Sequence, residues 1–265
     1  MIPSRTRRLS QSVQISTNLT HGAQVSQTGP DSWRLELPAG LQGSYRLAQL
    51  DDYTQRSRGH FPWKPPLSLT LRARASANQI QGTWGFGLWN DPFSFSMGFG
   101  GGARRLPALP NAIWFFFASP HNHLSLRDDL PSNGNLAAIF QSPSLPAYML
   151  SPGLFALPFM ALPPVARLLR QLARRFVRQE TVSFITDVNQ WHRYGLAWEA
   201  DRVCFALDNN NILESAISPH GPLGLVIWID NQYLAWTPNG HLGYGNLEAL
   251  QPAWVEIEDF RLDRA

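Results

Sequence analysis

Leu67-Ser-Leu-Thr-Leu-Arg-Ala-Arg-Ala75 alternates apolar residues with polar or charged ones over nine positions. Successive side chains of a β-strand point to opposite faces, so this period of two predicts a strand with one face in a core and the other in water. Similar stretches recur between turn residues, and one segment is clearly helical. We therefore predict an all-β fold, a jelly-roll β-sandwich. The expected strands cover residues 33–37, 43–50, 67–75, 83–90, 111–118, 123–127, 181–187, 194–199, 202–207, 223–229, 232–236 and 253–262.

Length and composition predict one large core. Of 265 residues, 44% are hydrophobic and only 15% are charged, which is below the usual share of charge. All-β sandwiches of this length often form a single domain. We expect a flexible polar arm over residues 1–30 and one sandwich domain over 31–265, interrupted by an insertion at 143–180. The single cysteine, Cys204, excludes an intrachain disulfide and is interpreted as a packed thiol.

Charge and hydropathy limit the partners. The net charge is +3, and 21 of the 22 basic residues are arginines, Lys64 being the exception. A net charge this small does not predict nucleic-acid binding. The first residues lack the apolar core of a secretion signal, and no apolar run reaches the roughly 18 residues of a membrane span. We expect a cytoplasmic protein, with a peripheral position at the inner membrane surface as the alternative.

The insertion contains the segment with helical periodicity. Its apolar residues share one face of a helix that begins at Pro163 and are Val165, Leu168, Leu169, Leu172 and Phe176. Two interpretations remain open. The helix packs across the sandwich by this face, or it is a lid or membrane-surface segment whose arginines suit anionic lipid headgroups. For the second interpretation, the expected contact residues are Phe155, Phe159, Leu168, Leu172, Phe176, Arg170 and Arg174.

A segment in the second half, residues 190–211, carries a family signature. The pair Trp191-His192 opens a strand, Trp198 closes it, and the next strand ends in the turn Asp208-Asn209. Residues 87–90 and 255–262 add two further segments to this signature. Together, the order and spacing of these segments resemble family 16 glycoside hydrolases of the concanavalin A-like lectin and glucanase superfamily. The resemblance covers roughly residues 30–265, apart from the insertion. The resemblance implies a concanavalin A-like sandwich. It also places Asp259 near a position that often holds a structural calcium ion, and we expect no other cofactor.

The resemblance implies which strand would carry catalysis. Asn111-Ala-Ile-Trp-Phe-Phe-Phe-Ala118 becomes the counterpart of the family's catalytic strand, where carboxylates attack the anomeric carbon and protonate the leaving oxygen. This stretch contains no Asp or Glu. We therefore expect no standard retaining glycoside hydrolase activity. Trp114 and the neighbouring phenylalanines instead predict an apolar, aromatic groove.

Aromatic and amide residues on the predicted strands form the candidate ligand site. Packing between two sheets explains each tryptophan taken alone, but their number exceeds what a core usually needs. A groove lined by several rings suits an apolar molecule or a sugar ring equally. The candidate ligand-binding residues are Trp84, Trp89, Asn90, Trp114, Phe116, Trp228, Asn231, Tyr233 and Trp236.

Ionisable groups within apolar strands are the candidates for chemistry, because burying them costs free energy unless they are paired. Asp230 follows Leu225-Val-Ile-Trp-Ile229, and a buried Asp with a raised pKa can act as a general acid or base. Asp91 and His123 are further acid/base candidates, although turn capping explains Asp91 equally well. His121-Asn-His123 has the spacing of a weak metal pair, without a convincing third ligand.

Three functions follow as alternatives. The first is binding of a hydrophobic or lipid-like small molecule in the aromatic groove, without glycoside hydrolase activity. The second is a non-standard enzyme, an isomerase or cyclase that uses acid/base chemistry on a lipophilic substrate. The third is a carbohydrate-binding module for glycans. A closed apolar cavity favours the first two, whereas an open groove with exposed tryptophan faces favours the third.

Overall fold

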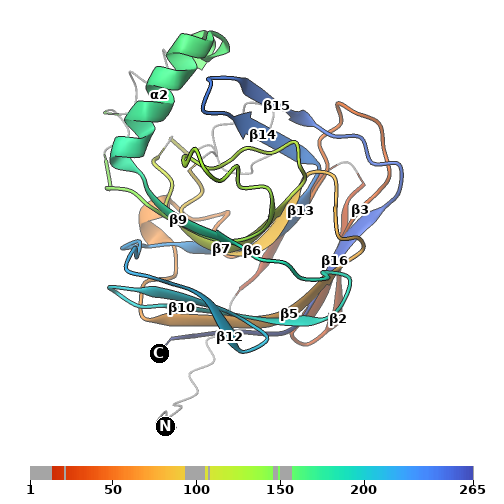
Figure 1. Cartoon of the computed structure of the whole chain (residues 1–265). Coiled ribbons are helices and arrows are strands. Elements are labelled where there is room, and N and C mark those ends of the chain that lie inside the picture. The colour runs from red at the N-terminus through yellow and green to blue at the C-terminus, as the bar shows by residue number, and fades with distance from the viewer. Residues whose placement is uncertain are drawn as a thin grey trace.

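Two seven-stranded antiparallel sheets lie face to face in the computed structural model (Figure 1). The structure describes residues 14–20, 22–92, 105–106, 108–145, 149 and 157–264. In spatial order, sheet A contains β1 (Ser16–Thr20), β4 (Leu47–Asp51), β13 (Gly224–Asp230), β6 (Thr83–Trp89), β7 (Ala112–Ala118), β8 (Gly134–Gln141) and β9 (Arg178–Ser183). Sheet B contains β12 (Asn210–Ser215), β11 (Val203–Leu207), β10 (His192–Trp198), β5 (Leu67–Ala75), β16 (Ala253–Arg264), β3 (Ser32–Leu37) and β2 (Gln24–Gly29). The predicted all-β jelly-roll sandwich is confirmed.

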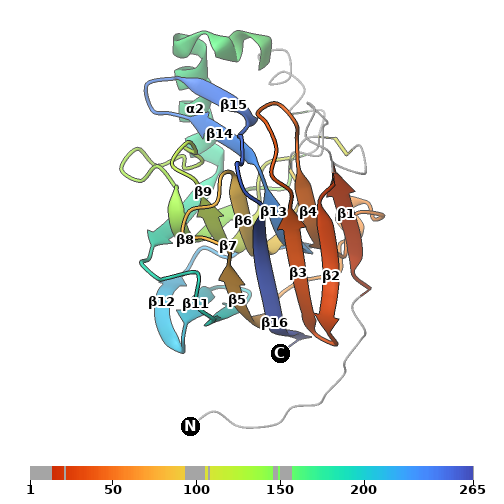
Figure 2. The same ribbon diagram turned by 90° about the vertical axis from the view of Figure 1, so that its right-hand side faces the viewer.

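The smaller elements lie outside these two sheets. β14 (Gln232–Trp236) and β15 (Leu242–Asn246) form a separate two-stranded sheet, and the helical segments are η1 (Arg58–His60), η2 (Leu157–Ala161) and α2 (Pro163–Phe176). Figures 1 and 2 both show α2 and the β14–β15 hairpin at the same end of the molecule. Within the described ranges, no helix is long and apolar enough to cross a membrane.

The core between the sheets follows from the alternation in β5. Leu67, Leu69 and Leu71 point inward and are buried, which the period of two predicts. Sheet A contributes aromatic rings to the same core: the ring centroid of Phe115 lies 5.1 Å from that of Phe205 in sheet B. Such edge-to-face contacts add to the free energy gained by removing apolar area from water.

The outer face of sheet B is charged. Arg72 and Arg74 of β5 pair with Glu258 and Glu256 of β16. The guanidinium groups of both arginines also lie over the ring of Trp191, at 5.4 and 4.8 Å from its centroid. These partly exposed pairs contribute little stability, but they make this face polar and leave sheet A as the apolar side of the molecule.

Several elements differ from the sequence-based expectations. β1 and β2 lie within the range expected for a loose arm. Their many Ser, Thr and Gln residues leave too few apolar side chains to show a strand pattern. Residues 123–127 form a loop instead of a strand, with His123 in a single bridge to Ala235. β8, β12 and β15 were not predicted; β8 is buried at four successive positions and shows no alternation. β9 begins inside the range expected for the insertion, because its residues complete the edge of sheet A beside β8.

Candidate functional site

The outer face of sheet A carries a second hydrophobic cluster. Strand alternation directs Trp228 of β13 and Trp114 and Phe116 of β7 away from the core between the sheets. Leu124, from the loop over residues 119–133, packs against these rings. Figure 1 shows connecting loops gathered on this side of the sheet. We call this surface the aromatic face.

Trp114 lies at the centre of the aromatic face. Its ring centroid is 5.4 Å from that of Phe116, 5.5 Å from Trp228, 5.8 Å from Trp89 and 6.3 Å from Phe140. These separations are typical of favourable ring contacts. Phe116 and Trp228 are only 7% and 8% exposed, whereas Trp89, Trp114 and Phe140 are partly exposed, so two of these rings are shielded and three are partly open to solvent.

Glycines in the neighbouring strands allow the rings to lie close against the sheet. A Cβ atom added at Gly85 would lie 2.7 Å from Cη2 of Trp228, and one added at Gly224 would lie 2.4 Å from Cδ1 of Tyr53. Neither position has room for a larger residue. The sequence Thr-Trp-Gly-Phe-Gly-Leu-Trp of β6 therefore has glycine where the aromatic face needs close approach.

Replacing Gly85 with alanine is expected to lower the free energy of unfolding by about 2 kcal/mol, because Trp228 and the Phe115 carbonyl must move away from the new methyl group. Gly195→Ala in β10 is the matched control, since its added Cβ meets no atom closer than 3.7 Å. Urea unfolding of both variants measures the difference. Equal urea midpoints for Gly85→Ala and Gly195→Ala would show that the sheet can accommodate a methyl group beneath Trp228.

The aromatic face encloses little empty space. A cavity of about 20 Å³ is lined by Trp114, Phe116, Leu124, Ser132, Leu136, Ala138 and Phe140. This volume holds about one water molecule, so a ligand can bind here only if a covering segment moves. Leu124 and Ser132 belong to the loop over residues 119–133, which is the described segment that would have to move.

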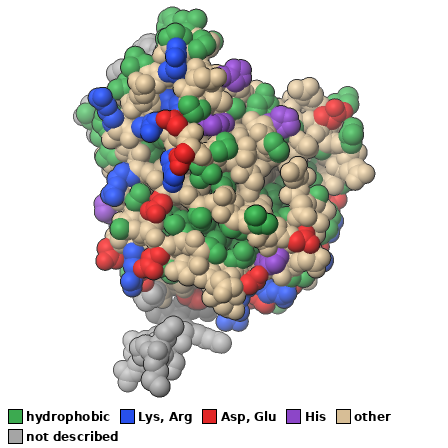
Figure 3. Space-filling view, in the orientation of Figure 1, with side chains coloured by type: hydrophobic (Ala, Val, Ile, Leu, Met, Phe, Trp, Pro, Cys, Tyr) green, Lys and Arg blue, Asp and Glu red, His purple; other side chains and the backbone are tan. Residues whose placement is uncertain are grey.

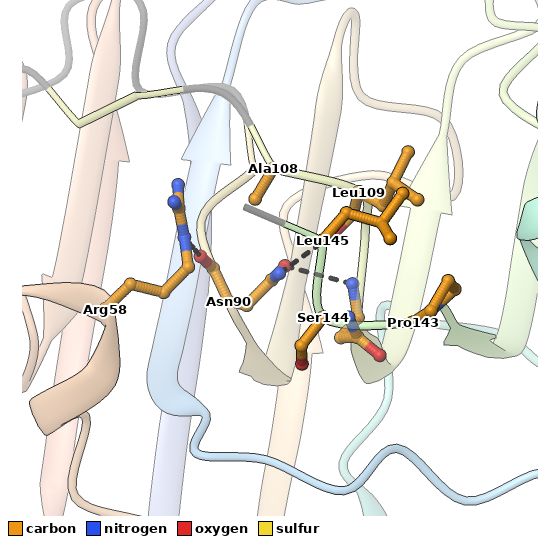
Figure 4. A pocket seen from close by; sticks show the side chains of 8 residues that line it. Arg58, Asn90, Ala108, Leu109, Pro143, Ser144 and Leu145 are labelled. Atoms are coloured by element: carbon orange, nitrogen blue, oxygen red, sulfur yellow. Dashed lines mark hydrogen bonds between the residues drawn. The ribbon is translucent and has the colours of Figure 1, made fainter. Parts of the chain in front are cut away.

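A second cavity, of about 150 Å³, is lined by Arg58, Asn90, Ala108, Leu109, Asn111, Pro143, Ser144 and Leu145 (Figure 4). The amide of Asn90 bonds to the chain itself, donating to Leu109 O at 2.8 Å and accepting from Asn111 N at 3.0 Å. The guanidinium of Arg58 donates to the carbonyl oxygens of Asn90 and Asp91. These polar groups hold the loops together, so Asn90 has a structural role here.

Asp230 is the buried carboxyl group at the end of β13. Its Oδ1 accepts the Thr83 hydroxyl at 2.7 Å, the Thr83 N–H at 3.2 Å and the Gln232 N–H at 3.3 Å. From the described residues, Oδ2 accepts no hydrogen bond. Burial raises the pKa of Asp230 to about 7, although the hydrogen bonds from Thr83 and Gln232 oppose the shift. The group therefore changes charge near neutral pH and has one oxygen uncommitted.

Thr83 and Tyr45 connect Asp230 with the aromatic face. The Thr83 hydroxyl accepts the Trp228 Nε1–H at 3.0 Å while it donates to Asp230. Tyr45 packs against the rings, and burial, followed by the charge of Asp230, raises the pKa of Tyr45 well above its ordinary value. A carboxyl group that titrates near neutral pH thus borders an apolar surface, which is the arrangement that acid/base chemistry on an apolar substrate requires.

Besides Asn90, four of the predicted ligand residues lie away from the aromatic face or are committed elsewhere. Trp84 points into the core and stacks on Phe117 with ring centroids 3.6 Å apart. The buried Asn231 amide donates to Ser44 O and Leu247 O. Trp236 donates its Nε1–H to a carbonyl of α2, and Tyr233 neighbours His121. Asp230 and the rings of Trp89, Trp114, Phe116 and Trp228 are the predicted residues that share this side of sheet A.

Asp91 and His123 lie in the loops that follow β6 and β7. Asp91 forms an ion pair with Arg105 and adopts a left-handed φ of 47°, as expected for a turn residue. The Nε2 atom of His123 is buried and has no hydrogen-bond partner among the described residues. Burial, and then the charge of Arg170, lowers the pKa of His123. The ring is therefore neutral in its loop at pH 7.

Asp259, near which the resemblance places a structural calcium ion, lies in β16 (Ala253–Arg264). Asp259 is exposed, with φ at 53°, where the pairing of β16 with β5 shifts register. Calcium requires six or more oxygen ligands. In the described part of the chain, no group of three or more His, Cys, Asp or Glu residues could hold a metal ion.

Sequence reasoning missed Tyr45, Tyr53 and Phe140, which also border the aromatic face. β4, which lies between Tyr45 and Tyr53, is buried at all five positions because sheet A is covered on both faces there. A strand buried on both faces shows no alternation, so no periodic signal marks its neighbours. Asp51, also missed, accepts hydrogen bonds from Gln49 and from the Tyr53 N–H within this layer.

The two antiparallel sheets form a jelly-roll β-sandwich, and the chain is similar in fold to several solved structures. LamAcat from Zobellia galactanivorans is 13% identical, with a TM-score of 0.46 over 89% of this chain and 78% of that one. A legume lectin-like domain from Entamoeba histolytica is 8% identical, with a TM-score of 0.48 over 95% and 90%. A glycoside hydrolase family 16 endo-glucanase from Bacteroides ovatus is 14% identical, with a TM-score of 0.47 over 91% and 84%.

These similarities concern the arrangement of the sheets alone. No protein-family model and no curated protein sequence matches the chain. The function is therefore argued from the residues of the aromatic face and of Asp230.

Proposed function

We propose that the protein binds a hydrophobic small molecule or a single acyl chain against the aromatic face of sheet A. The observation that carries this proposal is the continuous layer of rings around Trp114, on a face of the sheet that lies outside the main core. A sandwich does not need a second aromatic layer to fold. Such a layer, lined by small and apolar residues, has the chemistry of a binding site for apolar ligands.

Binding on this surface requires the loop over residues 119–133 to move. Leu124 occupies the place of a ligand in the closed arrangement, since it lines the small cavity together with Trp114 and Phe116. An apolar ligand would replace the contacts that Leu124 makes with the rings, which keeps the free-energy cost of opening low. Ligand pockets of drug-sized molecules measure roughly 300–1,000 Å³, so the opening must be substantial.

A glycan is the less favoured ligand. Sugar rings stack on exposed aromatic faces flanked by polar groups. Here Phe116 and Trp228 are almost fully buried, Trp89 and Trp114 are only partly exposed, and the cavity beside Trp114 is lined almost wholly by apolar side chains. The apolar lining of this cavity supports binding of an apolar molecule over a glycan.

Acid/base catalysis on a lipophilic substrate is the second candidate function. Oδ2 of Asp230 is uncommitted within the described structure, and its pKa of about 7 suits proton transfer at neutral pH. Trp228 and Tyr45 provide the apolar surroundings. This candidate uses the same surface as simple binding and differs from it only in turnover.

Replacing Trp114 with alanine is expected to weaken binding of decanoate at least about tenfold, because the central ring of the site is lost. Trp191→Ala, on the polar outer face of sheet B, is the matched control and is expected to bind like the unchanged protein. Native mass spectrometry and tryptophan fluorescence report binding of decanoate and of cellotetraose. Two results would overturn the proposal: binding of cellotetraose but not of decanoate, or an equal loss of decanoate affinity in Trp114→Ala and Trp191→Ala.

A further inference from the structure

The apolar face of α2 is not the face by which the helix packs. Ala166 and Arg170 are its buried residues, whereas Leu168, Leu172 and Phe176 are 56%, 40% and 49% exposed. At about 100° per residue, the exposed stripe lies roughly a quarter turn or more from the buried one. The interpretation in which the whole apolar face packs across the sandwich is therefore wrong, because three of its five residues are exposed and Val165 and Leu169 are only half-buried.

Specific contacts fix this orientation of α2. The guanidinium of the buried Arg170 donates to the carbonyl oxygens of Ser125 and Trp236, at 2.6 and 3.0 Å. The Trp236 Nε1–H donates in turn to Ala166 O at 3.1 Å. Because these bonds engage one side of the helix, the leucine side remains turned to solvent. The exposure is thus built into the packing and does not result from a loosely attached helix.

The exposed apolar surface extends beyond α2. Phe159 of η2 and Leu162, which precedes α2, are also exposed, as is Met149. Phe155, which the sequence analysis grouped with them, lies outside the described residues. In the space-filling view, hydrophobic side chains gather over α2 at the upper left of the molecule, with arginines beside them (Figure 3). Large exposed apolar patches mark interaction sites.

The charges on the segment that forms this patch are all positive. Residues 157–178 contain no Asp or Glu, and their exposed arginines are Arg167, Arg174, Arg175 and Arg178. Asp128 neutralises part of this charge through Arg170 and Arg174. An amphipathic helix with an apolar stripe and flanking arginines matches the interface of a bilayer that contains anionic lipids.

We propose that α2 and η2 dock the protein on the surface of an anionic bilayer, with Phe159, Leu162, Leu168, Leu172 and Phe176 in the interface and the arginines at the headgroups. The docking does not depend on the ligand proposed for the aromatic face. Hydrophobic contact supplies part of the affinity and attraction to anionic lipid supplies the rest, so binding requires both.

Vesicle co-sedimentation tests this proposal on the full chain. We expect binding to phosphatidylcholine vesicles that contain phosphatidylglycerol, little binding to phosphatidylcholine alone, and weaker binding as salt is raised. The double variant Leu168→Gln, Leu172→Gln is expected to lose at least about tenfold in partitioning. Ile185→Gln removes a fully exposed apolar side chain elsewhere and is expected to leave partitioning unchanged. Circular dichroism confirms that each variant is folded.

Three results would overturn the docking. These are no binding to the anionic vesicles, equal partitioning of the double variant and the unchanged protein, or a dimer that the double variant abolishes while vesicles bind neither form. The last result would assign the patch to a second copy of the chain. Trp114→Ala separates this proposal from the ligand proposal, because it is expected to bind vesicles normally.

Discussion

Replacing Arg170 with methionine is expected to weaken the attachment of α2 to the sandwich by about 3 kcal/mol. Arg170 is only 3% exposed, and its guanidinium donates to Ser125 O, Arg127 O, Trp236 O and the Asp128 carboxylate. Methionine keeps the apolar stem but leaves three carbonyl oxygens without their donor. A polar group that loses its partner in a shielded place costs more free energy than a broken surface ion pair.

Hydrogen exchange of the α2 amides measures this effect. A loss of about 3 kcal/mol corresponds to exchange that is faster by about two orders of magnitude. Arg175→Met is the matched control, because Arg175 is exposed on the same helix and forms no ion pair with any described residue. If Arg170→Met and Arg175→Met exchange at the same rate, Arg170 does not anchor the helix. Arg170→Met is also expected to change how the protein partitions onto vesicles, because the leucine stripe of α2 loses its fixed orientation.

Asp230→Asn is expected to stabilise the folded protein above pH 7 and to leave its stability near pH 4 almost unchanged. The ordinary pKa of this group is 3.8, and burial raises it to about 7 in the folded protein. Between these values the folded protein binds a proton that the unfolded chain has released. The free energy of unfolding therefore falls as pH rises through this window, by about 4 kcal/mol for a shift of about three units. Asparagine resembles the protonated form and removes this loss.

Urea unfolding from pH 4 to pH 8 checks the prediction. Burial also raises the pKa of Asp52, to about 6, so the variant is expected to retain a smaller fall in stability between about pH 4 and pH 6. Asp201→Asn, in an exposed turn, is the control and is expected to follow the unchanged protein. If Asp230→Asn unfolds with the same pH profile as the unchanged protein, Asp230 does not titrate in that window.

The same variant decides between binding and catalysis on the aromatic face. Deuterium uptake from D₂O into an apolar ketone such as 2-decanone reports proton abstraction next to a carbonyl group. Uptake that the unchanged protein promotes and Asp230→Asn does not would support the acid/base candidate. Equal uptake in both would leave ligand binding as the function of the face.

Parts of the candidate site could be predicted from the sequence and others could not. Asp230 stands out because a carboxyl group ends a wholly apolar run, and the cost of burying charge makes such a residue unusual. Thr83 and Tyr45, its neighbours in the fold, are distant in sequence and have no unusual local context. Trp84 and Trp228 have the same local character, yet one belongs to the core and the other to the aromatic face. No local pattern separates them.

The sequence by itself determined the fold class and the inner face of sheet B, because a strand with one solvated face must alternate, as β5 does. Only the tertiary structure decided which rings of β7 and β13 point outward, since these strands are apolar on both faces and carry no alternation. It also decided the orientation of α2. Hydrophobicity alone predicts that the leucine stripe is buried, but the hydrogen bonds of Arg170 and Trp236 turn that stripe to solvent.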